Sequence, residues 1–173
     1  MADSARILIV DDDPIVAESL GEHLAGEGFE TATAMNAAEA KALMDGASNF
    51  PTPNGRAPKP VQVVLSDVSM PGESGVDLLR WIKEHHPTTA VVMLTGYGTI
   101  ESAVEALRLG AADYLTKPVM DDELRVALER ALRQQALMAE NRTLKRALDD
   151  RFGLDNIVGS DHRMQKVFEL IGA

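Results

Sequence analysis

Acidic side chains follow two of the apolar segments in this 173-residue chain. Asp11, Asp12 and Asp13 come directly after one apolar run, and Asp67 comes two residues after another. Carboxylates that are brought together without cations repel one another and raise one another's pKa values. A hard divalent cation removes this conflict, and Mg²⁺, which binds one or two carboxylates and keeps several waters, fits best. We therefore expect a magnesium site that contains Asp12 and Asp67.

A hydroxyl and an ammonium group end two further segments. Thr95 closes an apolar run, and Lys117 closes the segment that begins at Asp113. A cation, a carboxylate, a hydroxyl and an ammonium group around one point would stabilise the equatorial oxygens of a phosphoryl group during transfer. An aspartate carboxylate is also a known type of covalent phosphoryl acceptor. Asp13 stands apart from this set because its position directly before Pro14 is typical of a helix cap.

Short apolar or β-rich segments alternate with helical patterns along the chain. The predicted strands are 7–10, 30–34, 61–65, 90–94 and 113–115. The predicted helices between them are 14–27, 37–44, 75–85 and 100–109. This alternation predicts an α/β fold, a doubly wound parallel sheet with helices on both faces. The first and third strands are neighbours in such a sheet, so Asp11 or Asp12 should meet Asp67 at its carboxyl edge, where ligands bind.

A continuous helical pattern without Gly or Pro runs from 121 to about 150. Such a helix would be about 45 Å long, so its second half should extend beyond a small domain. Three- and four-residue steps, the spacing of a coiled coil, separate Gln134, Leu137, Asn141, Leu144 and Leu148. A solvated single helix remains the alternative for this segment.

The charge of the chain is negative and unevenly distributed. The formal net charge is −10, and residues 1–120 hold 17 acidic side chains against 8 basic ones. This balance argues against electrostatic binding of the whole chain to nucleic acid or to an anionic membrane. The lack of cysteine excludes disulfides and thiolate sites. No signal peptide and no apolar run long enough to span a bilayer is visible, which favours a cytoplasmic protein without a membrane partner.

Four motifs, in this order along the chain, resemble the receiver domain of two-component response regulators. They are ILIVDDD at 7–13, SDVSMPG at 66–72, VMLTG at 92–96 and DYLTKP at 113–118. The resemblance covers about residues 5–133. It implies a flavodoxin-like fold, with five parallel strands in the order 2-1-3-4-5, to which this chain adds a long C-terminal helix. It also implies a cis peptide bond before Pro118.

The resemblance gives each residue of the acidic cluster a role. Asp67 would be the phosphoacceptor, and Asp11 and Asp12 would form the acidic pocket beside it. Mg²⁺ would be bound by Asp12, Asp67 and the main-chain carbonyl of Ser69, in a metal site that comprises Asp11, Asp12, Asp67 and Ser69. The domain would be a phosphoacceptor switch and not an enzyme acting on other substrates. It would catalyse only its own Mg²⁺-dependent phosphorylation and dephosphorylation, with a sensor histidine kinase as donor.

The resemblance also implies how phosphorylation is sensed. Lys117 would contact the acyl phosphate, and Thr95 would be the switch hydroxyl. Tyr114 would be the aromatic switch residue, which changes its burial when Thr95 moves. The bulky Tyr97, two residues after Thr95, is expected to shield the site from solvent.

The end of the chain resembles the opening of the AAA+ module in sigma-54-dependent transcription activators. The motifs NIVGS at 156–160 and MQKVFELI at 164–171 carry this resemblance. We expect a receiver domain over 1–133, a linker or coiled-coil helix over 134–151 and the start of the AAA+ module over 152–173. No G-x-x-x-x-G-K-[ST] motif occurs, so ATP hydrolysis by this chain is not expected.

Phosphorylation would control a transcription activator through this arrangement. The expected partners are a sensor histidine kinase and a second copy of the chain, paired as a homodimer through the helix over 134–148. Sigma-54 RNA polymerase and DNA would be contacted only by domains that these 173 residues do not contain.

A phosphohydrolase of the haloacid dehalogenase type is the alternative. Such an enzyme would use Asp11 as nucleophile and Asp13 as acid/base, again with a later Thr and Lys. The acidic pair that it needs after the Lys-bearing segment would have to be Asp121 and Asp122, with little fold left to position it. The Met-Pro-Gly motif at 70–72 would have no role.

Overall fold

A computed structural model of the protein describes residues 4–46 and 60–152. The chain divides into two units, residues 1–137 and 138–173, and the fold below is that of the first. Apart from Phe152, the expected start of the AAA+ module lies outside the described residues.

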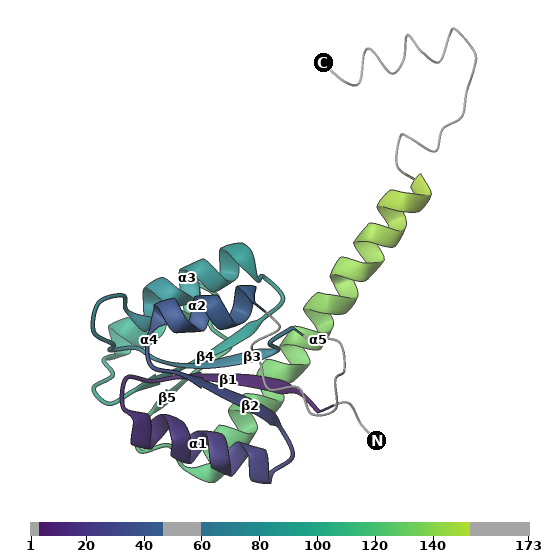
Figure 1. The fold of residues 1–173 in the computed structure, drawn as a ribbon. Helices are drawn as coiled ribbons and strands as arrows, with labels where there is room; N and C mark the ends of the chain where they lie inside the picture. The colour runs from purple at the N-terminus through teal and green to yellow at the C-terminus, as the bar shows by residue number, and fades with distance from the viewer. Residues whose placement is uncertain (1–3, 47–59, 153–173) are drawn as a thin grey trace, which may run out of the picture. The chain divides into compact units, whose positions relative to one another are not determined.

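Parallel strands form one twisted sheet in the described part of the chain (Figure 1). The strands are β1 (Arg6–Val10), β2 (Glu30–Ala34), β3 (Val63–Asp67), β4 (Ala90–Thr95) and β5 (Asp113–Thr116). The helices are α1 (Pro14–Gly26), α2 (Ala37–Asp45), α3 (Gly75–His85), α4 (Ile100–Arg108) and α5 (Asp121–Phe152). The strand order is β2-β1-β3-β4-β5. The predicted α/β class, the strand order and the long last helix are confirmed.

The start of β3 differs from its prediction by two residues. Val61 is buried, as its apolar character indicates. Its carbonyl, however, accepts a hydrogen bond from the Thr89 hydroxyl at 2.9 Å instead of joining the backbone ladder. Burial alone therefore does not make a residue part of a strand, and β3 begins at Val63.

Side chains of β1 alternate between two apolar cores, one on each face of the sheet. Leu8 and Val10 pack in a core with side chains of α2, α3 and α4. Ile7 and Ile9 pack on the opposite face with side chains of α1 and of the first turns of α5. Figure 1 shows α2 and α3 on one side of the sheet and α1 on the other. Each fully buried Leu or Ile contributes about 1.5–3 kcal/mol, so both faces stabilise the sheet that carries the site.

Capping residues begin the first four helices. Side chains of Asp13, Asn36, Ser74 and Thr99 each accept a hydrogen bond from a backbone amide in the first turn of the following helix. Such caps satisfy amides that have no partner within the helix. The prediction that Asp13 is a helix cap is confirmed, since its carboxylate accepts from the Ile15 amide at 2.9 Å.

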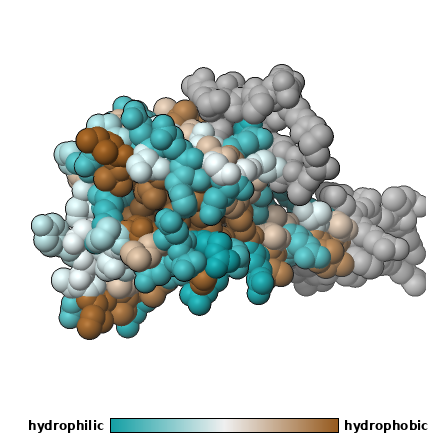
Figure 2. All heavy atoms as spheres, turned by 90° about the horizontal axis from the view of Figure 1, so that it is seen from below, coloured by the Kyte–Doolittle hydropathy of each residue, from teal (hydrophilic) through white to brown (hydrophobic). Residues whose placement is uncertain are grey.

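The surface of the described residues mixes hydrophilic and apolar side chains. Figure 2 views the α1 side, where hydrophilic side chains cover much of the face and apolar ones form several separate patches between them. Large exposed apolar side chains of the first unit include Ile15, Tyr97, Ile100, Leu107 and Met120. None of the described helices has both the length and the hydropathy that crossing a bilayer requires.

Candidate functional site

The sheet brings the ends of four strands together at its carboxyl edge. Val10 of β1 pairs with Ser66 of β3, so Asp11 follows β1 beside the point where Asp67 ends β3. On the other side of β3, Asp67 pairs with Leu94. Thr95 in turn pairs with Thr116, the residue before Lys117. The register of the parallel ladders therefore positions every polar residue that the sequence singled out at this edge.

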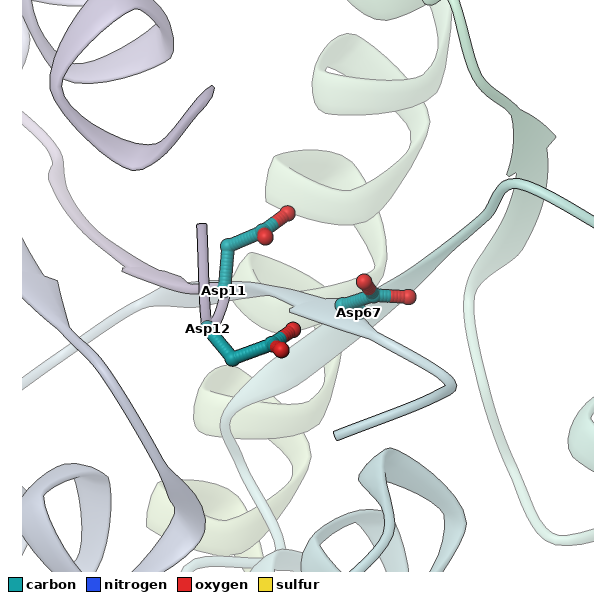
Figure 3. Close-up of side chains that lie close together, drawn as sticks. All are labelled: Asp11, Asp12 and Asp67. Atoms are coloured by element: carbon teal, nitrogen blue, oxygen red, sulfur yellow. The ribbon is translucent and has the colours of Figure 1, made fainter. Parts of the chain in front are cut away.

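Three carboxylates meet at this edge. Figure 3 shows Asp11 and Asp12 at the end of β1, with their carboxylates on the side where Asp67 lies. One oxygen from each of the three lies within 4.8 Å of the others. Asp11 and Asp67 are buried, at 0 % and 7 % exposure, whereas Asp12 is exposed. Hard oxygen ligands, two of them shielded from water, fit Mg²⁺ or another hard divalent cation, and Asp12 leaves an open side for water ligands.

Lys117 contributes one positive charge to this cluster. Its Nζ donates to Asp11 Oδ2 at 2.5 Å and to Asp67 Oδ2 at 2.8 Å. Burial by itself would lower the pKa of the Lys117 ammonium, but hydrogen bonds to Asp11 and Asp67 outweigh it and hold this pKa above its ordinary value. The peptide bond between Lys117 and Pro118 is cis, as expected. One ammonium group against three carboxylates leaves the cluster negative, which again favours a cation.

Backbone amides fix the two buried carboxylates. The Asp13 amide donates to Asp11 Oδ1 at 3.0 Å, and the Ser69 amide donates to Asp67 Oδ1 at 3.1 Å. Each buried carboxylate is thus held by Lys117 at one oxygen and by an amide at the other. The Ser69 amide thus orients the Asp67 carboxylate.

Thr95 is buried beside this cluster, at 1 % exposure. Its Oγ1 accepts a hydrogen bond from the Tyr97 amide at 3.2 Å. The Tyr97 side chain is 100 % exposed, so the expectation that it shields the site is wrong. The hydrogen bond from the Tyr97 amide to Thr95 Oγ1 closes a short turn at the end of β4. The Tyr97 ring projects from this turn into solvent.

Tyr114 lies in β5, where it pairs with Met93 of β4. Its ring packs against the core that α2, α3 and α4 form with the sheet. Its hydroxyl lies 2.9 Å from Ser102 Oγ in α4. The structure thus brings Asp11, Asp12, Asp67 and Lys117 together in one cluster. Thr95 ends β4 at the same edge, and Tyr114 lies in β5, three residues before Lys117.

Gly75, the first residue of α3, is a site residue that the sequence reasoning missed. A Cβ at this position would lie 1.9 Å from the Asp67 carbonyl oxygen. The Gly75 amide also donates to the Val68 carbonyl at 3.0 Å. α3 therefore begins in direct contact with the main chain of Asp67. The available signal was a glycine at the first position of a capped helix, where most other residues form helix more readily.

The sequence profile of the response regulator receiver domain matches residues 7–129. The chain belongs to this family. Relatives include the C4-dicarboxylate transport transcriptional regulatory protein DctD of Pseudomonas aeruginosa, 36% identical over 169 residues, which are 97% of this chain and 34% of that protein. The chain spans about a third of the length of these curated relatives, among them DctD and the regulatory protein AtoC of Escherichia coli.

Solved receiver structures share the fold. The receiver domain of NtrX from Brucella abortus is 37% identical with a TM-score of 0.62, and the match covers 73% of this chain and 98% of that one. A beryllofluoride-activated NtrC4 receiver domain dimer is 30% identical with a TM-score of 0.63, and the match covers 75% and 98% of the two chains. The resemblance to receiver domains drawn from the four motifs is confirmed.

The contact between Gly75 and Asp67 gives a first prediction. Replacing Gly75 with Ala should destabilise this receiver by about 1–3 kcal/mol, because the new methyl group must push a β3 carbonyl that cannot move without its neighbours. Urea unfolding monitored by circular dichroism measures the change. Gly26→Ala is the matched control, since a Cβ at Gly26 meets nothing within 4 Å. Equal stabilities of Gly75→Ala and Gly26→Ala would contradict the contact.

Proposed function

We propose that this receiver accepts a phosphoryl group on Asp67 from the phosphohistidine of a sensor histidine kinase. The observation that carries the proposal is how Asp67 is held. One carboxylate oxygen accepts from the Ser69 amide at 3.1 Å and the other from Lys117 at 2.8 Å. The side chain remains 10 % exposed. It is therefore both fixed in one orientation and open to an incoming group.

The transfer needs few groups from the protein. An oxygen of Asp67 forms a bond to phosphorus as the N–P bond of the phosphohistidine breaks, and the electron pair of that bond returns to the imidazole. Lys117 can exchange a carboxylate oxygen for a phosphoryl oxygen without leaving the site, because it already lies between Asp11 and Asp67. Positioned charge of this kind is the main contribution of proteins to phosphoryl transfer. The same groups would serve the later attack of water on phosphorus, which returns Asp67 to its free carboxylate.

Asp11, Asp12 and Asp67, with the main-chain carbonyl of Ser69, would hold Mg²⁺. When bound, Mg²⁺ neutralises negative charge on the phosphoryl oxygens during the transfer. Asp12 is the exposed member of the set, so we assign to it the main role in capturing the cation from solvent. Asp11 is fully buried and fixed by the Asp13 amide, and its role is to anchor Lys117 as well as the cation.

The new phosphoryl group would be read by Thr95 and Tyr114. Thr95 is buried at the same strand edge, and its hydroxyl, whose oxygen accepts from the Tyr97 amide, would donate its own proton to a phosphoryl oxygen. Tyr114, in the neighbouring strand, would change its position in response, and α4 and β5 would repack. The chemistry thus occurs at one end of the sheet, and the response appears on the surface of two elements beside it.

The response would be altered assembly of a cytoplasmic, sigma-54-dependent transcription activator. DctD, to which the chain is similar, is named as a transcriptional regulatory protein. We propose the division into a receiver over 1–133, a linker helix over 134–151 and the start of an AAA+ module over 152–173. Sigma-54 RNA polymerase and DNA would then be partners of domains outside these 173 residues.

The phosphohydrolase alternative is disfavoured by the contacts of Asp13. Its carboxylate accepts from the Ile15 amide and caps α1, whereas an acid/base must reach the leaving group. Asp13 also lies outside the cluster that Asp11, Asp12 and Asp67 form. We therefore retain the receiver function alone.

Replacing the phosphoacceptor tests the proposal. Wild-type chain incubated with acetyl phosphate and Mg²⁺ should gain the mass of one phosphoryl group, and Asp67→Asn should not, because it lacks the accepting oxygen. Asp11→Asn should still be modified, more slowly. Intact-protein mass spectrometry measures all three. A stable acyl phosphate on Asp67→Asn would falsify the assignment, and loss of modification in Asp11→Asn alone would favour the phosphohydrolase.

Removing the metal gives a third prediction. EDTA should abolish modification by acetyl phosphate, because the three carboxylates then repel the incoming anion. Asp12→Asn should raise the Mg²⁺ concentration for half-maximal modification at least about tenfold. Even mutating a residue that only hydrogen-bonds to a metal ligand lowers the metal affinity about tenfold or more. Glu18→Gln, which removes a carboxylate of α1 outside the cluster, is the control. Modification that is unaffected by EDTA would show that no metal is needed.

The homodimer proposed through the helix over 134–148 is tested at Leu144. Leu137, Leu144 and Leu148 are 61%, 57% and 56% exposed, an apolar row that pairing would bury. Light scattering should give a dimer for wild type and a smaller mass for Leu144→Gln. Arg142→Gln, two positions away on another face of the same helix, should leave the mass unchanged. A monomeric wild type, with and without acetyl phosphate, would instead indicate the solvated single helix.

A further inference from the structure

Ser102 joins the first turn of α4 to Tyr114. Thr99 caps α4, and its side chain accepts from the Ser102 amide. In return, Ser102 Oγ accepts from the Thr99 amide at 3.2 Å and donates to the Thr99 carbonyl at 2.9 Å. The same Oγ lies 2.9 Å from the Tyr114 hydroxyl. One serine hydroxyl therefore serves both a helix cap and the proposed switch tyrosine.

Counting the hydrogen bonds of Ser102 identifies the donor. A hydroxyl group offers one proton and two acceptor positions. The proton goes to the Thr99 carbonyl, and the Thr99 amide takes one acceptor position. The Tyr114 hydroxyl at 2.9 Å takes the other, since the Thr99 hydroxyl is more distant at 3.4 Å. Tyr114 is thus the donor, and Ser102 has no capacity left.

The position of this hydrogen bond leaves the Tyr114 ring little freedom. A Cβ at Gly98 would lie 2.9 Å from the Tyr114 hydroxyl oxygen and 2.7 Å from Thr95 Cγ2. Gly98 therefore allows Thr95 and Tyr114 to pack against the same short stretch of backbone. Under the proposed function, Thr95 would move toward Asp67 and open space beside Gly98, and we expect a shift of the Tyr114 ring into that space to draw its hydroxyl away from Ser102.

We propose that Ser102 is a positioning residue that latches Tyr114 to the first turn of α4 before phosphorylation and releases it afterwards. This inference rests on the function proposed for Asp67 and deepens it by naming a residue that sets the switching equilibrium. A hydrogen bond made in only one of two states favours that state by its own net free energy. Loss of the latch should therefore make the phosphorylated conformation easier to reach.

The first test is a double-mutant cycle in the free 173-residue chain. Ser102→Ala and Tyr114→Phe each remove one partner, and urea unfolding measures the effect of each change alone and of both together. Each single change should raise the equilibrium constant for unfolding. The double variant should raise it about fivefold less than the product of the two single effects, which corresponds to one neutral hydrogen bond. Thr99→Ala is the control, because it weakens the same cap without touching Tyr114, and its effect should be additive with that of Tyr114→Phe.

The second test measures switching with beryllofluoride and Mg²⁺, as a mimic of the acyl phosphate, by calorimetry. Ser102→Ala and Tyr114→Phe should each lower the Kd for beryllofluoride about fivefold. Ser102→Thr, which restores the hydroxyl, should return the Kd to the wild-type value. Thr99→Ala should leave the Kd within about twofold of wild type. The cap is needed in both states, so its loss destabilises both equally and does not change the free-energy difference between them.

The outcomes separate this inference from the proposed function. An unchanged or raised Kd in Ser102→Ala, with binding that still requires Asp67, overturns the latch and leaves the phosphoacceptor role intact. Additive stability effects of Ser102→Ala and Tyr114→Phe also overturn the latch. Failure of wild type to bind beryllofluoride, or equal binding by Asp67→Asn, overturns the function of Asp67 and the latch with it.

Discussion

Three carboxylates held at the ends of two adjacent strands are the constraint on which the rest of this molecule depends. Asp11 and Asp67 are buried, and isolated buried carboxylates would take up protons instead of remaining charged. Two backbone amides and the ammonium group of Lys117 compensate part of this charge. The remaining negative charge suits a divalent cation, which in the proposed function would in turn favour an anionic phosphoryl donor. If Lys117 and the two amides compensated the charge of the carboxylates completely, the cluster would not favour a cation.

The fold supplies the rigidity that this cluster needs. β1 and β3 are buried on both faces, so the main chain at Asp11 and Asp67 cannot yield to the repulsion between their side chains. Gly75 brings the start of α3 against the Asp67 carbonyl, which adds a third element behind the site. By contrast, α4 contributes a single residue, Ala106, to the buried core. The helix that is proposed to repack is therefore the one that contributes fewest buried residues to the packing around the site.

The sequence predicted the elements well because runs of apolar residues report burial directly, and the resemblance to receiver domains supplied the strand order. The ends of β2 and α3 agree with their predicted bounds, and the strand order placed Asp11 beside Asp67 before any coordinates. Contacts between side chains of distant segments have no such pattern. Nothing in the sequence indicates that Gly98 separates Thr95 from Tyr114, or that Ser102 holds Tyr114 in addition to a helix cap. Tyr97 shows the opposite error, since a bulky side chain near a site was expected to cover it and is fully exposed.

The magnitudes at the two ends of the switch are suited to each other. A phosphoryl group brings about −1.5 to −2 units of charge, and two unit charges 4 Å apart interact by about 4 kcal/mol at an effective dielectric constant of 20. The contact between Ser102 and Tyr114 is one neutral hydrogen bond, worth about 1 kcal/mol net. In the proposed function, phosphorylation would therefore supply more than enough free energy to break the proposed latch. The same small value would still change the population of the alternative state about fivefold, so in the proposed function a single hydroxyl in α4 would set how much of the response is present before phosphorylation.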